Sequence, residues 1–396
     1  MNRLFPLLLL LLWAANCTSP TTEANPNVAL VNRAVDSLRQ TFAPDKRTAL
    51  WQPEVEFGPG KVTIAGETNF PEARKELIRI LDKASIRYVD SLRVLPDSVG
   101  LRGKVYGVVN LSVANMRSEP KHSAELSTQT TLGTPLKVLK QEGDWYYVQT
   151  PDGYLGWLDA GGFVPMDAVE FQTWKKADKI VYLPAVGQSF ASRNPKDGPV
   201  SDLLAGNILA LDEEKYGRAY VRYPDGRTAV LPAKEVMPYR DWLTRSPPGP
   251  TAILQTAQNM LGTPYLWGGT SAKGMDCSGY TKTVFYLNGL QLPRDASQQI
   301  HVGQVVEVDT SDWSPLRPAD LLFFGSYRDD GSPRITHVAI HEGEGRIIHA
   351  TGRVKRESLN RADADFAEDR FLTFMGARRM LGAEDVPALR KVAAYQ

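Results

Sequence analysis

The sequence predicts an α+β protein of several units, with two small β-barrels in the middle of the chain. At 396 residues the chain is too long for one ordinary domain. An internal repeat combines short alternating apolar stretches with Pro-Asp-Gly turns, which is typical of small barrels. Helical and strand patterns alternate after a proline-rich segment, which indicates a mixed domain at the C-terminal end.

The composition is that of a soluble globular protein. Hydrophobic residues make up 42% of the chain and charged residues 23%. The 46 basic residues are balanced by 45 acidic ones, so the sequence forces no polybasic surface. We therefore expect no nucleic-acid partner.

The N-terminus has the pattern of an export signal. Arg3 precedes an apolar run, residues 4–15, which is too short to span a bilayer and resembles the core of a secretory signal. Cys17 follows at once, where a bacterial lipoprotein carries its acylated cysteine. We expect an exported protein of the periplasm or cell envelope that touches the membrane only through this lipid anchor. Asn16 is bulkier than the residue usual there, so simple secretion and an uncleaved anchor stay open.

The chain divides into five predicted segments. A Ser/Thr/Pro-rich tether leads into a small mixed α/β subdomain with no catalytic signature, in which residues 27–42 and a segment capped by Asn69 are expected helices. Strands are expected at 61–65 and 86–95. The segments are a signal peptide (1–17), the tether and subdomain (18–104), a first barrel (105–168), a second barrel (169–245) and the C-terminal domain (246–396).

The two barrels are read from the repeat. Residues 147–153 return as residues 220–226 at an offset of 73. The first copy also carries the stretch 115–120 and a Gly-Trp pair at 156–157. These features resemble bacterial SH3 domains, well in the first barrel and weakly in the second. The proline-rich segment 246–250 then predicts an extended linker that spaces the next domain.

Cys277 is the residue on which the function depends. The chain has two cysteines, so loss or lipidation of Cys17 leaves Cys277 alone in an oxidising compartment, either buried and inert or reactive. Apolar residues after Gly279 predict a helix with Cys277 in its first turn. Free amides at a helix N-terminus should lower the pKa of the thiol and could later bind an oxyanion.

Histidines on two expected strands could serve this thiol. Residues 334–341 and 346–350 alternate as a hairpin, and a three-residue loop would place His349 directly opposite His337. A two-residue loop would instead place Val338 opposite. Two such rings can act as base and orienter. His341 is expected to be structural or solvent-facing, because the strand edge ends there. His-x-x-x-His binds metal on a helix and this segment is a strand, so we do not expect these histidines to hold a metal.

Six ordered motifs carry a family resemblance over about residues 250–380. They are Tyr-x-Trp-Gly-Gly from 265, Asp-Cys-Ser-Gly from 276, Leu-Pro-Arg-Asp from 292, Pro-Ala-Asp-Leu-Leu-Phe-Phe from 318, His-Val-Ala-Ile from 337 and His-Ala from 349. This order resembles the NlpC/P60 family of papain-like cysteine peptidases. The resemblance implies Cys277 as nucleophile, His337 as base and acid, and His349 as the orienter of His337.

The layout also resembles a subgroup with two SH3 domains before the peptidase. Its enzymes cut the bond between γ-D-glutamate and the diamino acid in peptidoglycan-derived peptides with a free N-terminal L-alanine. One departure is that Ala296 follows Asp295, so a hydroxyl directly after the aspartate is missing here and comes only at Ser297. The substrate-binding residues that the resemblance implies are Asp276, Ser278, Tyr265 and Asp295, with Glu119 and Tyr154 as candidates from the first barrel.

Other activities remain as alternatives. The chain could be a general peptidoglycan endopeptidase or an N-acetylmuramoyl-L-alanine amidase acting on intact wall. It could also be a non-catalytic wall-binding protein, although the intact Cys277, His337 and His349 set argues against that. We expect a monomer without metal or organic cofactor, and the sequence leaves diaminopimelate and lysine equally open at the scissile bond.

Overall fold

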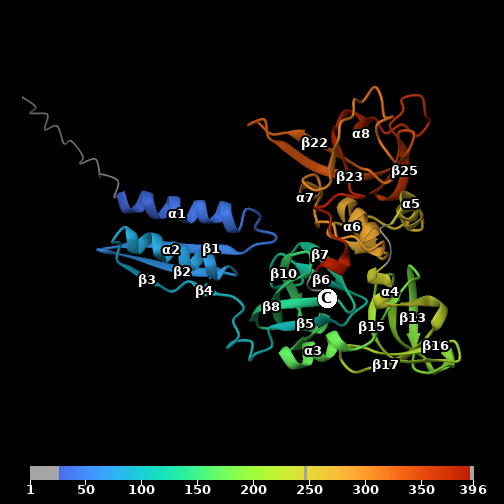
Figure 1. The fold of residues 1–396 in the computed structure, drawn as a ribbon, viewed down its shortest axis with the longest axis horizontal. Coiled ribbons are helices and arrows are strands. Elements are labelled where there is room, and N and C mark those ends of the chain that lie inside the picture. The colour runs from blue at the N-terminus through green and yellow to red at the C-terminus, as the bar shows by residue number, and fades with distance from the viewer. Residues whose placement is uncertain (1–25, 245–247, 393–396) are drawn as a thin grey trace, which may run out of the picture.

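The computed structural model describes residues 26–244 and 248–392 and arranges them in four units (Figure 1). The N-terminal unit, in blue, lies at one end beside the first barrel, and the C-terminal domain, in orange and red, lies above the two barrels. The expected signal segment and Cys17 lie outside the described residues. Within the two described ranges, no helix is long and apolar enough to cross a membrane.

The N-terminal unit packs two helices on a four-stranded sheet around a single apolar core. Strand β1 is antiparallel to β2, which pairs in parallel with both β3 and β4. The second helix starts at Pro71 as expected, but its cap is Phe70, because the Asn69 side chain accepts a hydrogen bond from the Leu50 amide instead. The elements are α1 (Pro26–Phe42), β1 (Trp51–Gly58), β2 (Lys61–Thr68), α2 (Pro71–Lys83), β3 (Tyr88–Asp90) and β4 (Arg93–Val94).

The first barrel is a seven-stranded antiparallel sheet in the order β11-β5-β8-β9-β10-β6-β7. Its core is apolar and small, and the helix α3 follows it under a capping box formed by Asp167 and Glu170. The elements are β5 (Tyr106–Val109), β6 (Val113–Arg117), β7 (Leu126–Thr131), β8 (Pro135–Glu142), β9 (Trp145–Gln149), β10 (Leu155–Asp159), η1 (Ala160–Gly162), β11 (Phe163–Met166) and α3 (Ala168–Lys176).

The second barrel repeats the first. Its strand order, read from the matching edge, is β18-β12-β15-β16-β17-β13-β14, which is the first order with every label raised by seven. Strands β9 and β16 stand 73 residues apart at both ends, as the sequence repeat predicts. The elements are β12 (Lys179–Tyr182), β13 (Val186–Phe190), η2 (Pro195–Asp197), β14 (Pro199–Leu204), β15 (Ile208–Lys215), β16 (Arg218–Arg222), β17 (Thr228–Pro232), η3 (Ala233–Glu235), β18 (Val236–Pro238) and α4 (Tyr239–Thr244).

The C-terminal domain is built on a six-stranded sheet in the order β21-β26-β22-β23-β24-β25. Helix α6 packs against β23 and β24 and shares with them the largest apolar core among the described residues. The elements are α5 (Pro250–Gln258), β19 (Thr270–Ser271), β20 (Gly274–Met275), α6 (Cys277–Leu287), α7 (Ala296–Gln299), β21 (Gln304–Val306), β22 (Leu321–Tyr327), β23 (Pro333–Gly343), β24 (Arg346–Thr351), β25 (Arg353–Ser358), α8 (Glu368–Leu372), β26 (Phe374–Arg379) and η4 (Leu389–Lys391).

The expectation that a linker spaces the C-terminal domain is wrong. Trp242, at the end of the second barrel, is buried against Tyr286 of α6 and Leu389 near the C-terminus. Its indole Nε1 also donates to the Leu287 carbonyl at 3.3 Å. Apolar burial outweighs the extended preference of a short proline segment, so the barrels and the C-terminal domain form one packed body.

Candidate active site

Helix α6 begins at Cys277, as the sequence predicts. Asp276 is its N-cap and accepts a hydrogen bond from the Gly279 amide at 2.7 Å. A capping carboxylate of this kind satisfies one of the free amides of the first turn. The cap fixes the start of the helix and therefore the position of the Cys277 thiol, which is buried.

Arg294 holds the cap in place. Its guanidinium donates to both carboxylate oxygens of Asp276, at 3.1 and 2.6 Å, and to the Ser278 hydroxyl at 3.0 Å. Its Nε donates to Thr128 Oγ1, on strand β7 of the first barrel. The charge of Asp276 is therefore matched by a buried partner inside the protein. The side chains of Ser278 and Asp276 lie together, and the Asp276 carboxylate is already paired with Arg294.

The thiol is not pre-ionised, and this corrects the expectation from the helix terminus. Burial raises the pKa of Cys277 to about 11, and the negative charge of Asp276 adds to the effect. The amides of Val338 and Ser278 act toward the sulfur and lower the pKa, but by less. Desolvation of an anion outweighs a few amide dipoles here, so the thiol needs a base to remove its proton.

A chain of side chains from β23, β24 and β25 supplies that base. His337 Nε2 lies 2.8 Å from His349 Nδ1, and His349 Nε2 lies 2.7 Å from Glu357 Oε2. The hydrogen bond from His349 lowers the pKa of Glu357 to about 2, so Glu357 is a carboxylate and can only accept.

These partners assign the tautomers. Burial lowers the pKa of both His337 and His349, so both rings are neutral. His349 gives its only proton to Glu357, and its Nδ1 must then accept from the Nε2 proton of His337. The remaining nitrogen of His337, Nδ1, keeps a free lone pair. That lone pair is what a general base for Cys277 requires.

The two histidines meet diagonally and not directly across the hairpin. Ile340 pairs with Ile348, so continuing this register places His349 opposite Ala339. The turn uses only Glu344 and Gly345, both at positive φ (52° and 73°), and a bulge before Gly343 absorbs the extra residue. Both expected registers are therefore wrong, yet the rings still share one face of the sheet.

Tyr265, Tyr154 and Asp295 line one end of the site. Burial raises the pKa of Tyr265 to about 12, and the nearby Cys277 and Asp276 contribute. The Tyr154 hydroxyl, from the first barrel, bonds to the Asp295 carboxyl. Burial raises the pKa of Asp295, although Arg294 and Arg47 act against it. Asp295 also caps α7, where its amide donates to Gln298 Oε1.

The Glu119 side chain faces solvent. Its carboxylate is 60% exposed and pairs with Lys121 two residues away at 2.7 Å. A neighbouring acid of the first barrel, Glu125, does contact the C-terminal domain and accepts a hydrogen bond from the Trp267 indole at 2.7 Å. Glu119 and Glu125 lie in the same loop between β6 and β7, so their positions in the sequence do not show which of them contacts the C-terminal domain. His341 is structural as expected: it is buried between the Arg317 carbonyl and the Gly345 amide.

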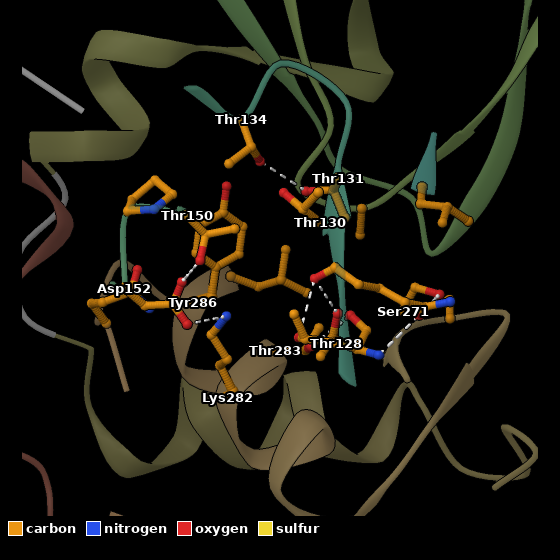
Figure 2. A pocket seen from close by; sticks show the side chains of 18 of the residues that line it. Thr128, Thr130, Thr131, Thr134, Thr150, Asp152, Ser271, Lys282, Thr283 and Tyr286 are labelled. Atoms are coloured by element: carbon orange, nitrogen blue, oxygen red, sulfur yellow. Dashed lines mark hydrogen bonds and ion pairs between the residues drawn. The ribbon is translucent and has the colours of Figure 1, made fainter. Parts of the chain in front are cut away.

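A polar cavity lies where the first barrel meets α6, away from Cys277 (Figure 2). Threonines of the barrel line one side, while Lys282, Thr283 and Tyr286 of α6 face them. Lys282 pairs with the buried Asp152 at 2.9 Å, and Gln129 accepts from the Thr270 amide at 3.0 Å. These contacts fasten the barrel to the catalytic helix.

Comparison with known proteins agrees with this geometry. The model of the NlpC/P60 family matches residues 262–374, and that of the bacterial SH3 domain matches residues 112–164. A solved structure titled as an NlpC/P60 family protein from Bacillus cereus has a TM-score of 0.59 and 25% identity. It covers 70% of this chain and 99% of its own.

Two curated relatives are named γ-D-glutamyl-L-lysine dipeptidyl-peptidase. The one from Bacillus cereus is 30% identical over 234 residues, 57% of this chain and 67% of its own. The one from Bacillus subtilis is 28% identical, over 57% of this chain and 72% of its own. Dipeptidyl-peptidase 6 of Lysinibacillus sphaericus is 29% identical, over 65% and 91%. With Cys277 at the head of α6 and the His337–His349–Glu357 chain beside it, the chain belongs to the NlpC/P60 family of cysteine peptidases.

Proposed function

We propose that the protein is a cysteine peptidase of cell-wall turnover that hydrolyses the bond between γ-D-glutamate and the next L-diamino acid. Its substrates are peptidoglycan-derived peptides with a free N-terminal L-alanine. The observation that carries the proposal is the chain Glu357–His349–His337, which ends next to Val338, the residue whose amide bonds to the buried Cys277 thiol. The names of the relatives from the two Bacillus species support the choice of bond.

The reaction follows from the assigned tautomers. His337 Nδ1 takes the thiol proton as the sulfur of Cys277 attacks the scissile carbonyl, and amides at the α6 N-terminus stabilise the oxyanion. The C–N bond breaks, and His337 returns the proton to the leaving amine. His337 then takes a proton from water, the resulting hydroxide attacks the thioester, and the C–S bond breaks. The proton on His337 returns to the sulfur.

Charge at the Asp295 end supports selection of a cationic peptide terminus. Three carboxylates meet there, Asp45, Asp276 and Asp295, with two guanidinium groups, Arg47 and Arg294. These five groups together carry one net negative charge. A protonated L-alanine amine would neutralise it, whereas the acylated amine of a glycan-linked stem would not.

The test uses the tripeptide L-Ala-γ-D-Glu-diamino acid, with diaminopimelate or lysine at the third position, and whole sacculi, with products identified by mass spectrometry. The wild type should release L-Ala-γ-D-Glu from the tripeptide and act poorly on sacculi. Cys277→Ala should abolish the reaction, His337→Ala should nearly abolish it, and EDTA should leave it unchanged. Equal cleavage of the tripeptide and its N-acetylated form would make a general wall endopeptidase the better assignment.

We also propose that the protein is exported and lipid-anchored at Cys17. The family acts on the cell wall, and the apolar run before Cys17 has the length of a signal core. Labelling with a fatty-acid analogue should tag the wild type and not Cys17→Ala. An untagged wild type recovered outside the cytoplasm would mean plain secretion.

A further inference from the structure

A loop of the N-terminal unit reaches the Asp295 end of the site. Residues 43–50 join α1 to β1, and they precede both segments that the family models match. From this loop Arg47 donates through one terminal nitrogen to Asp295 Oδ2 at 2.9 Å and to the Ser297 hydroxyl at 3.0 Å. The hydroxyl two positions after Asp295 is therefore occupied by a residue from another unit.

Arg47 is held rigidly from its own side. Its Nε and second terminal nitrogen donate to Asp45 at 2.9 and 2.6 Å, and Asp45 also accepts from Gln298 at 2.7 Å. A planar guanidinium gripped along one edge in this way points its other edge in a fixed direction. That direction is toward Asp295.

The loop backbone is fastened to the first barrel. The Leu155 amide donates to the Arg47 carbonyl at 2.7 Å, and the Gln149 side chain donates to the Thr48 carbonyl at 2.9 Å. At the end of the loop, Leu50 is buried against Leu139 and Leu155 of the barrel. Three units of the protein therefore meet around Arg47, and the loop is a fixed wall of the site and not a displaceable plug.

We propose that Arg47 is a specificity-determining residue: it orients Asp295 and keeps it available as the anion that receives the cationic N-terminus of the peptide. This inference rests on the proposed function. Arg47 occupies Asp295 Oδ2, and the Asp295 side chain is still 26% exposed, so room remains for a second cation. The N-terminal unit thus acts in substrate selection as well as in joining the tether to the barrels.

The charges around Asp295 give the sign of the effect. The groups that face it are Arg47, Arg294, Tyr154 and Asp276, with Asp45 behind Arg47. Removing Arg47 removes one of two cations that oppose burial, so the pKa of Asp295 rises further. As the pH falls, Asp295 should then become protonated, and stop binding the free amine of the peptide, at a higher pH than in the wild type.

The experiment compares full-length wild type, Arg47→Ala and Arg47→Lys on the tripeptide and its N-acetylated form, from about pH 4 to pH 8. The ratio of the two kcat/KM values isolates the recognition of the amine, because both substrates need the same state of His337. Arg47→Ala should lower kcat/KM for the free-amine peptide about tenfold, through KM, and move the acid limb of the ratio to higher pH. Arg47→Lys keeps the charge and should restore the acid limb.

Arg74→Ala is the matched control, since Arg74 forms a comparable ion pair with Asp90 at 2.7 Å inside the same unit. It should leave both readouts unchanged. If Arg47→Ala fails to fold, Arg47→Gln gives the same comparison without the charge. A wild type that does not prefer the free amine would refute the proposed function. A wild type that does prefer it, with KM and acid limb unchanged in the Arg47 variants, would overturn this inference alone.

Discussion

Replacing Arg294 by methionine should be among the most damaging single changes in the catalytic domain. The Arg294 side chain is 1% exposed and that of Asp276 is 7% exposed, so the substitution leaves a buried carboxylate without its partner. Breaking a buried pair in this way typically costs about 3–5 kcal/mol. The amides of Gly279 and Gly268 and the Ser278 hydroxyl still donate to Asp276, so we expect the lower end of that range, about 3 kcal/mol.

The assay for this loss is denaturant-dependent labelling of the Cys277 thiol, in a background with Cys17 replaced by serine. Cys277 is buried beside the substituted pair, so its labelling reports opening of the catalytic domain even if the four units do not unfold together. Arg79→Met is the control, because it breaks an exposed pair with Glu76 and should cause no measurable change. If Arg294→Met lowers the free energy of unfolding by less than about 1 kcal/mol, the reasoning is refuted, because a buried carboxylate without its partner destabilises by more than that.

Three further predictions follow from the same geometry. Burial lowers the pKa of His341, so the unfolded chain binds a proton that the folded one does not. Stability should therefore be full above about pH 6.5 and fall below it, and thermal unfolding of His341→Gln should show a flatter pH dependence. Glu357→Gln should lower kcat about tenfold while His349→Ala costs more, because the amide keeps a hydrogen bond to His349 without its charge; equal kcat for Glu357→Gln and wild type would contradict the tautomer chain. Glu119→Ala should leave tripeptide KM unchanged while Tyr154→Phe raises it, and the reverse result would return Glu119 to the site.

The parts of the fold that depend on local pattern could be read from the sequence. The offset of 73 residues predicts two copies of one barrel, and β9 and β16 keep that offset at both ends. The helix headed by Cys277 follows from the apolar residues after Gly279. Local turn chemistry and periodicity determine these features, and no distant contact overrides them.

The features that were missed depend on contacts between distant segments. The histidine register depends on a bulge whose presence no residue signals in the sequence. Glu357 shares a face with His349 only through the pairing of β24 with β25, and Arg47 reaches Asp295 across 248 residues. Alternation along β25 could have suggested Glu357 as a partner for His349. No comparable local signal points to Arg47.

The protonated state of the Cys277 thiol affects both its resistance to oxidation and its reactivity. Because burial raises the pKa of Cys277 to about 11, the thiol is almost entirely protonated at neutral pH. Oxidants attack the thiolate and not the thiol, so burial and the negative charge of Asp276 protect Cys277 from oxidation. The same protection would stop catalysis if the nucleophile had to be ionised in advance. In the proposed reaction His337 Nδ1, whose lone pair is kept free by the bond from Nε2 to His349, resolves the conflict, because it takes the thiol proton as the sulfur attacks the carbonyl carbon.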